Sequence, residues 1–318
     1  MTDLTPLKNT HPALFDLAEA AKNYIDQSLS FATRKAYASD FKIFTAWCAT
    51  HAVPALPAAP ETVALFLAGQ AAAGIASSTL TRRIAAIKFA HEAAGHATPT
   101  AHKGVTAALK GIRRAQGTAP TKKKAATADL VKEMVRRCPD TLTGKRDRAL
   151  LLLGFAGAFR RSELVALTVA DLAFVDDGLR ITIRKSKTDQ EGAGQVIAIP
   201  LGSLLFCPVA ALKNWLAAAG IEAGAVFRAV GKGSRIGSAA LSDKSVANRV
   251  KHYAGHIGLD TADFAAHSLR AGFVTSAAEA GASIFKMAEV SRHRSTDVLA
   301  GYVRSANLFK DHAGVDLL

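Results

Sequence analysis

Two short motifs of the chain place arginine side chains beside groups that could orient them. Arg160 follows a glycine-bearing turn in FAGAFRRSEL, and Glu163, three residues later, supplies a carboxylate that could orient basic groups. His267 and Arg270 lie in HSLRAG at a spacing that puts both side chains on one face of a helix. Planar guanidinium groups bind phosphate oxygens through paired hydrogen bonds. The two arginines therefore suit a site that stabilises negative charge during phosphoryl transfer.

Three further residues would complete such a site. His293 lies in a polar break, Tyr302 follows it by nine residues, and Lys187 lies in the polar segment KSKTDQEGAG. A tyrosine hydroxyl can act as a nucleophile, a lysine can protonate a leaving oxygen, and histidines can donate further hydrogen bonds. Each residue alone has an ordinary structural interpretation, because single Arg and Lys side chains are usually solvated and a single Tyr usually packs. Together they predict phosphoryl transfer without a metal ion.

In order and spacing these residues resemble the catalytic set of the tyrosine recombinases, or phage-type integrases, and the resemblance covers the whole chain. One departure is that the family's usual Gly-His pair is Arg292-His293 here, which alters the turn and removes no functional group. The resemblance implies Arg160 rather than Arg161 as the first catalytic arginine. The implied catalytic residues are Arg160, Lys187, His267, Arg270, His293 and Tyr302, with Glu163 in support.

The resemblance also implies a reaction and an assembly. Tyr302 would attack the scissile phosphate of double-stranded DNA, form a 3′-phosphotyrosyl bond and release a 5′-hydroxyl, with four protomers acting on two recombination sites. No metal, ATP or small-molecule cofactor would be needed. The apolar tail over 305–318 looks Cre-like and is expected to form an exchange helix that docks on a neighbouring protomer. A type IB topoisomerase and a DNA-binding protein that no longer cleaves remain as alternatives.

The composition agrees with a polyanionic partner. The 318 residues include 40 Lys plus Arg against 26 Asp plus Glu, a formal net charge of +14, and such a surplus favours binding to phosphates. Three scattered cysteines favour a reducing compartment. The N-terminus has no secretory pattern and the longest apolar run, at 149–158, is too short to span a bilayer. We expect a cytoplasmic protein that does not contact the membrane.

The first part of the chain, residues 1–116, predicts a helical domain, and the resemblance implies that it is a core-binding domain of the SAM-like type. Thr33 is the predicted N-cap of its first long helix. A proline-broken connector follows at 52–60. Apolar residues at helical spacing predict helices over 34–50, 61–73, 79–95 and 106–114.

Basic residues of this domain and of the next segment are the predicted DNA contacts. Since a helix fits the major groove and arginine can pair with guanine, some of them would read sequence. The equally weighted alternative is that they contact phosphates alone. Residues 117–126, with three consecutive lysines and no large apolar side chain, predict an exposed basic linker. The predicted contacts are Arg34, Lys35, Thr79, Arg82, Arg83 and Lys88, together with Lys122, Lys123 and Lys124.

The remainder, residues 127–318, predicts a mostly helical catalytic domain with a small antiparallel sheet, so that the fold class is mainly α. Alternating stretches at 179–184 and 195–199 predict a strand pair. His252 and His256 have a metal-ligand spacing, but no third ligand is in frame, so no metal is expected. The glycine-rich stretch 231–237 predicts a flexible loop. Helices are predicted over 127–138, 145–157, 161–167, 208–219, 243–256, 268–280 and 283–290, and from about residue 307.

Overall fold

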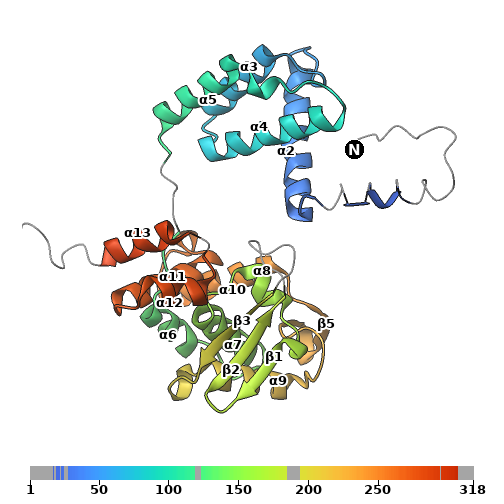
Figure 1. The fold of residues 1–318 in the computed structure, drawn as a ribbon. Helices are drawn as coiled ribbons and strands as arrows, with labels where there is room; N and C mark the ends of the chain where they lie inside the picture. The colour runs from blue at the N-terminus through green and yellow to red at the C-terminus, as the bar shows by residue number, and fades with distance from the viewer. Residues whose placement is uncertain are drawn as a thin grey trace, which may run out of the picture. The chain divides into compact units, whose positions relative to one another are not determined.

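The computed structural model describes residues 17, 19–21, 23–24, 28–118, 123–184, 194–293 and 295–306, without the side chain of Ser305. The chain forms two compact units, Met1–Thr121 and Lys122–Leu318 (Figure 1). Each unit has its own hydrophobic core. Among the described residues, no helix is long and apolar enough to cross a membrane.

The first unit consists of helices, as predicted. Its elements are α2 (Phe31–Thr50), α3 (Pro60–Ala72), α4 (Ser77–Ala93), a 3-10 turn at Pro99–Ala101 and α5 (Lys103–Gln116). Helix α2 packs on α4, and α3 packs on α5. The prediction of Thr33 as the N-cap of α2 is wrong, because the helix begins three residues earlier than predicted, and its N-cap Ser30 accepts the Thr33 amide hydrogen at Oγ at 3.2 Å.

Aromatic and aliphatic side chains from α2, α3, α4 and α5 close the core of this unit. Phe44 of α2 and Phe66 of α3 are fully buried, and their ring centroids lie 5.1 Å apart edge to face. Leu80 and Ile87 of α4 and Val105 of α5 complete the cluster. The spacing of Leu80 and Ile87 is two helical turns, so both lie on the buried face of α4.

The second unit combines helices with two small antiparallel sheets, which confirms the predicted fold class. The predicted strand pair corresponds to β2 (Gly178–Ile183) and β3 (Gln195–Pro200), with Ile181 opposite Ile197. The prediction omits β1 (Leu172–Val175) at the edge of the same sheet, and the β4 (Arg228–Val230) and β5 (Ile236–Ala240) hairpin around the glycine-rich stretch. The helices are α6 (Ala128–Arg136), α7 (Leu142–Ala156), α8 (Arg161–Ala166), α9 (Pro208–Ala219), α10 (Asp243–His256), α11 (His267–Glu279), α12 (Ile284–Ser291) and α13 (Thr296–Ala306), with 3-10 turns at Val169–Asp171, Leu204–Phe206, Lys232–Ser234 and Thr261–Asp263.

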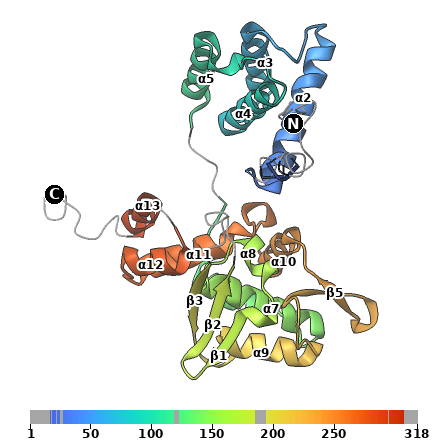
Figure 2. The ribbon, with the colours of Figure 1, turned by 45° about the vertical axis from the view of Figure 1, so that its right-hand side comes forward.

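Helix α7 lies at the centre of the second unit. Leu150, Leu151 and Leu153 are fully buried although they point in different directions around the helix, which is typical of a helix covered on all sides. Figure 2 shows α7 and α9 on one face of the three-stranded sheet, and Ile181 and Ile197 of that sheet belong to the same core cluster as α7. The turn after α7 therefore starts from a rigid base.

Residues 123–126 belong to the second unit, and within the predicted exposed linker over 117–126 the side chains of Lys123 and Lys124 are exposed, whereas Ala126 is a correction because it is buried. The amide of Lys124 donates to Asp263 O at 2.8 Å, and the amide of Ala126 donates to Ser268 O at 2.9 Å. Ala126 is fully buried. A Cβ added to Gly272 would lie 1.7 Å from Ala126 O, so glycine is needed for this approach. These contacts fix the first turn of α11.

Candidate active site

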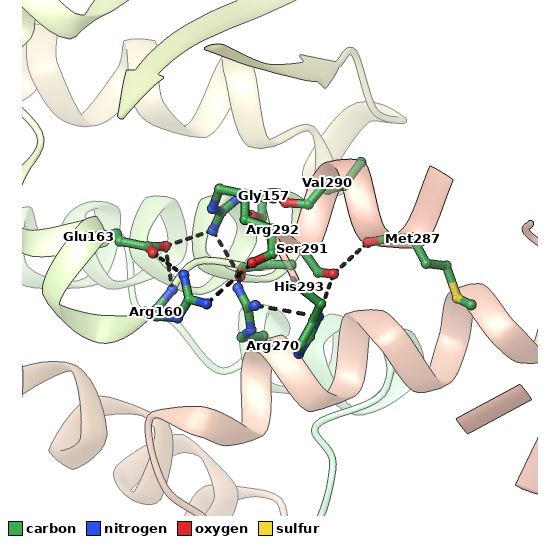
Figure 3. Close-up of polar contacts among 10 residues, drawn as sticks. Gly157, Arg160, Glu163, Arg270, Met287, Val290, Ser291, Arg292 and His293 are labelled. Carbon is green, nitrogen blue, oxygen red and sulfur yellow. Dashed lines mark hydrogen bonds and ion pairs between the residues drawn. The ribbon is translucent and has the colours of Figure 1, made fainter. Parts of the chain in front are cut away.

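The turn between α7 and α8 positions Arg160 against Glu163. Arg160 is the N-cap residue of α8, and its amide donates to Glu163 Oε2 at 2.9 Å. Its Nη1 donates to Glu163 Oε1 at 2.6 Å (Figure 3). The Glu163 side chain is 1% exposed and that of Arg160 is 13% exposed. The carboxylate thus orients the arginine, as the sequence predicts, while leaving one edge of the guanidinium group accessible.

The first turn of α11 brings the second predicted arginine to the same place. Arg270 is 2% exposed, and its Nη1 donates to Ala158 O at 2.8 Å. Its Nη2 lies 3.4 Å from His293 Nδ1. His267, the first residue of α11, is exposed and lies close enough to His293 to influence its pKa. The structure therefore brings Arg160, Arg270 and both predicted histidines together.

A third arginine, Arg292, belongs to the same cluster, and the sequence does not predict this role. It follows α12 in the left-handed region at φ 56° and ψ 44°, and its side chain is 3% exposed. Its Nη2 donates to Glu163 Oε2 at 2.7 Å and to Ala158 O at 3.1 Å. Its Nη1 donates to Gly157 O at 2.9 Å. The expectation of a merely altered turn is thus incomplete. The sequence did contain one indication of this role: Arg292 occupies the position where the family that the chain resembles usually has glycine.

The buried charges of this cluster do not balance. Burial, and then the neighbouring Arg160 and Arg292, lower the pKa of Arg270, although a guanidinium group stays protonated at neutral pH. Burial would raise the pKa of Glu163, but Arg292 and Arg160 outweigh it, so the pKa lies below its ordinary value. Three guanidinium groups thus face this one ionised carboxylate. Binding an anion such as phosphate would relieve the repulsion.

His293 is held neutral beside these cations. Burial, and then Arg270 and Arg160, lower its pKa from 6.5 to about 4. The Ser291 hydroxyl donates to Met287 O at 2.5 Å, and it lies 2.7 Å from His293 Nδ1. That hydroxyl has already used its hydrogen and can only accept from Nδ1, whereas Arg270 Nη2 at 3.4 Å could only donate to it. We assign the hydrogen bond to the shorter Ser291 contact, so Nδ1 carries the proton and Nε2 is the acceptor of the ring.

This environment predicts that His293 destabilises the folded chain in acid. Between pH 6.5 and about 4 the unfolded chain takes up a proton that the folded chain does not, so the free energy of unfolding should fall as the pH falls. His293→Gln should weaken this pH dependence. In a Trp47→Phe background the second unit can be followed by Trp215, the one remaining tryptophan, during urea unfolding across this pH range. An identical pH dependence in both proteins would show that His293 titrates normally.

Tyr302 lies on helix α13, which the sequence analysis did not predict, and the helix predicted from about residue 307 lies outside the described residues. The ring is half-buried and packs near Val274 and Met287. Its charged form would raise the pKa of Arg270, which places Tyr302 within electrostatic range of the cluster. Lys187, Lys122 and residues 307–318 lie outside the described residues.

The predicted DNA contacts of α4 divide into two kinds. Arg82 is 52% exposed, and it donates to the buried carboxylate of Asp40 from Nε at 2.6 Å and from Nη2 at 3.1 Å. Arg83 is a correction: its side chain is 9% exposed, donates to Gln70 and lies over the ring of Phe66. Because a buried guanidinium cannot reach a base edge, Arg83 supports the core of the first unit.

The other predicted contacts of the first unit stay accessible. Lys35 and Lys88 are exposed, while Arg34 and Thr79 are partly buried. Helix α5 adds basic residues that the sequence did not single out, although their spacing on one helical side was a readable signal. These exposed residues are Lys103, Lys110 and Arg114.

Lys123 and Lys124, at the start of the second unit, bind other residues of that unit. Lys123 Nζ donates to Ala262 O at 2.6 Å, and Lys124 Nζ lies 2.7 Å from Asp263 Oδ2. Both lysines therefore have partners within the protein, which weakens the case for them as dedicated phosphate contacts. Among the described residues no group of three potential ligands could hold a metal ion. The rings of His252 and His256 lie 4.1 Å apart without a third ligand.

Comparison with known proteins places this geometry in context. Residues 124–308 match the phage integrase family. The chain is 41% identical over 308 residues to an integrase/recombinase xerD homolog of Selenomonas ruminantium, covering 93% of this chain and 88% of the relative. It is 31% identical over 176 residues to the tyrosine recombinase XerC of Pelotomaculum thermopropionicum, covering 52% of each chain.

Solved structures share the fold at low sequence identity. The Tn1549 transposon integrase in complex with transposon right end DNA matches with a TM-score of 0.62 at 13% identity, covering 89% of this chain and 92% of that one. A lambda integrase dimer bound to a COC′ core site matches with a TM-score of 0.61 at 17% identity, covering 93% and 82%.

Proposed function

The chain belongs to the phage integrase family of tyrosine recombinases, and from this premise we propose that it cuts and rejoins double-stranded DNA through a covalent bond to Tyr302. The attack forms a bond between Tyr302 Oη and the scissile phosphorus and breaks the bond to the 5′-oxygen. The released 5′-hydroxyl then attacks the phosphotyrosyl bond of a partner strand. Each step exchanges one phosphodiester for another, so no external energy source is required.

The convergence of Arg160, Arg270 and Arg292 on one turn is the observation that carries this proposal. Their buried positive charge exceeds the charge of Glu163 and suits the nonbridging oxygens of a phosphate. Arg160 keeps part of its guanidinium group accessible. The site thus has fixed donors that need little reorganisation when charge develops in the transition state.

The remaining residues have separate proposed roles. His293 Nε2 accepts the phenolic proton of Tyr302. Alternatively, a His293 that has become protonated beside the bound phosphate donates a hydrogen bond to that phosphate. His267, on the exposed first turn of α11, donates to the phosphate. Lys187, between β2 and β3 in the sequence, protonates the leaving 5′-oxygen. In the first unit, exposed cations on α2, α4 and α5 bind the DNA backbone and grooves.

A trapping experiment tests this function. A duplex site is first selected from a random-sequence library by the purified chain. A nick placed near the scissile phosphate lets the short cleaved fragment diffuse away, so that a covalent adduct accumulates. We expect an adduct that resists denaturation and forms in the presence of a metal chelator without ATP. Strand exchange between two such sites separates a recombinase from a topoisomerase, and the lack of any adduct would leave a non-cleaving DNA-binding protein.

We further propose that the apolar tail of one protomer docks on a neighbour and links four copies on two sites. The second unit has an apolar pocket of about 400 Å³ that could receive such a segment. Side chains from several helices and the 3-10 turn after β3 line it, including Val131, Leu152, Phe155, Phe206, Phe273 and Val290. The tail carries matching residues, Leu308, Phe309, Val315, Leu317 and Leu318.

A stop codon after Ala306 tests this docking while preserving α13. The truncated chain should still bind one half-site but lose cooperative binding of the second protomer and recombination. Gel-shift titration on half-sites and full sites measures both properties. Leu201→Glu, at an exposed position in the lining of the acceptor pocket, should reproduce the same loss in the full chain. Normal assembly of four truncated protomers on two sites would show that the tail does not link them.

A further inference from the structure

We infer that Arg292 is a positioning residue that holds both Arg160 and Arg270 in place for the scissile phosphate. The inference rests on the proposed function, because it assigns those two arginines to the phosphate. Arg292 contacts the supports of both arginines, one through a carboxylate and one through a backbone carbonyl (Figure 3).

The link to Arg160 runs through Glu163. Arg160 binds one oxygen of this carboxylate with its side chain at 2.6 Å, and Arg292 binds the other at 2.7 Å. The backbone of Arg292 also contributes, because its carbonyl oxygen accepts from Arg160 Nη2 at 3.3 Å. Removing the Arg292 side chain would leave Glu163 held by Arg160 alone, through its amide at 2.9 Å and its guanidinium group at 2.6 Å, so the direction of Arg160 would be fixed less firmly.

The link to Arg270 runs through Ala158. Its carbonyl oxygen accepts from Arg270 Nη1 at 2.8 Å and from Arg292 Nη2 at 3.1 Å. Ala158 has φ 44°, a conformation that non-glycine residues rarely adopt. Arg270 and Arg292, which are both more than a hundred residues away in the sequence, therefore hold the carbonyl group of this strained turn together. A shift of the Ala158 carbonyl would move the guanidinium group of Arg270.

Arg292 itself has few donors left for a phosphate. Its Nη1 donates to Gly157 O and Val290 O, and its Nη2 donates to Ala158 O and Glu163 Oε2. These contacts use the four hydrogens of the two Nη atoms. The fifth donor, Nε, is buried, and the guanidinium carbon lies 5.2 Å from the Phe159 ring centroid. Arg292 therefore acts through its neighbours.

The backbone conformation of Arg292 does not require an arginine, so the presence of arginine here is explained by the contacts of its side chain. At φ 56° glycine would be the less strained choice. Arg292→Gly therefore keeps the turn while it removes the guanidinium group. This variant separates loss of positioning from a change in backbone conformation.

Single-turnover cleavage of the selected DNA site by Arg292→Gly tests the inference. We expect cleavage to slow by about 100-fold, the scale of a small misplacement of catalytic groups, with DNA affinity unchanged. Arg292→Lys should recover part of the rate, because the lysine ammonium group can bind Glu163. It cannot at the same time replace the guanidinium hydrogen bonds to Ala158 O and Gly157 O. On a duplex with a neutral methylphosphonate at the scissile position, the loss should shrink to below about 10-fold, because less charge requires stabilisation.

A buried arginine elsewhere provides the matched control. Arg146 is 6% exposed and donates to Asp147 at 2.9 Å and 2.7 Å. Arg146→Gln should lower the unfolding temperature, yet cleave the phosphate and methylphosphonate duplexes in the wild-type ratio. A wild-type cleavage rate for Arg292→Gly would overturn the inference, and so would an equal loss on both duplexes. If the wild-type chain itself forms no adduct, the proposed function fails instead.

Discussion

Tyr302→Phe should abolish covalent adduct formation while DNA affinity stays within about twofold of wild type. The phenolic oxygen is the proposed nucleophile, and no other group can take its place in a phosphotyrosyl bond. Phenylalanine preserves the packing of the ring near Val274 and Met287 on α11 and α12, so the fold should not change. Gel-shift titration and denaturing electrophoresis of the nicked duplex measure the two properties on the same samples.

The other tyrosines supply the controls for this result. Tyr37 lies in the first unit, with its ring centroid 5.7 Å from that of Phe89, and Tyr37→Phe should retain adduct formation. Tyr253 is a poor nucleophile, because burial raises its pKa far above the ordinary value and its hydroxyl donates to Asp147 at 3.1 Å. Adduct formation by the Tyr302→Phe protein would remove Tyr302 from the mechanism.

Arg160→Ala and Arg270→Ala should each slow cleavage by at least about 10²–10³-fold, equivalent to about 3–4 kcal/mol for one donor aimed at developing charge. Each substitution removes a guanidinium group whose orientation the protein fixes, through Glu163 for Arg160 and through Ala158 O for Arg270. Single-turnover cleavage at saturating protein isolates the chemical step from DNA binding.

Arg161→Ala is the matched control, because Arg161 adjoins Arg160 in the sequence but points elsewhere. Its side chain is 52% exposed and pairs with Asp243 at 3.0 Å, and an exposed pair contributes little to stability. Cleavage by this variant should stay within a few-fold of wild type. If Arg161→Ala were the slow variant and Arg160→Ala the normal one, the assignment of the first catalytic arginine would be reversed.

Much of the site could be predicted because its residues have a fixed order and spacing. The i, i+3 spacing of His267 and Arg270 placed both on the first turn of α11, and Glu163 lies beside Arg160 as the sequence suggests. Arg292 could not be assigned in the same way. Its acceptors, Gly157 O, Ala158 O and Glu163, lie more than a hundred residues away in the sequence, so only the folded chain shows that it is paired.

The errors in the fold have related physical causes. Strand β1 and the β4–β5 hairpin are short and mostly exposed, so they show little of the apolar alternation that marks β2. The last part of the predicted linker contains small and charged residues, yet the close approach of Ala126 to Gly272 buries Ala126. The sequence predicts that Arg83 is a surface charge, because its contacts with Gln70 and Phe66 form only in the folded chain. In each case a tertiary contact overrides the local pattern.

The identity of the DNA-linked amino acid tests the central claim most directly. The trapped wild-type adduct would be digested with protease and nuclease, and the modified peptide sequenced by mass spectrometry. The proposed mechanism predicts a nucleotide joined through its 3′-phosphate to Tyr302, in the peptide containing AGYVR. Attachment to another residue, or through a 5′-phosphate, would contradict it.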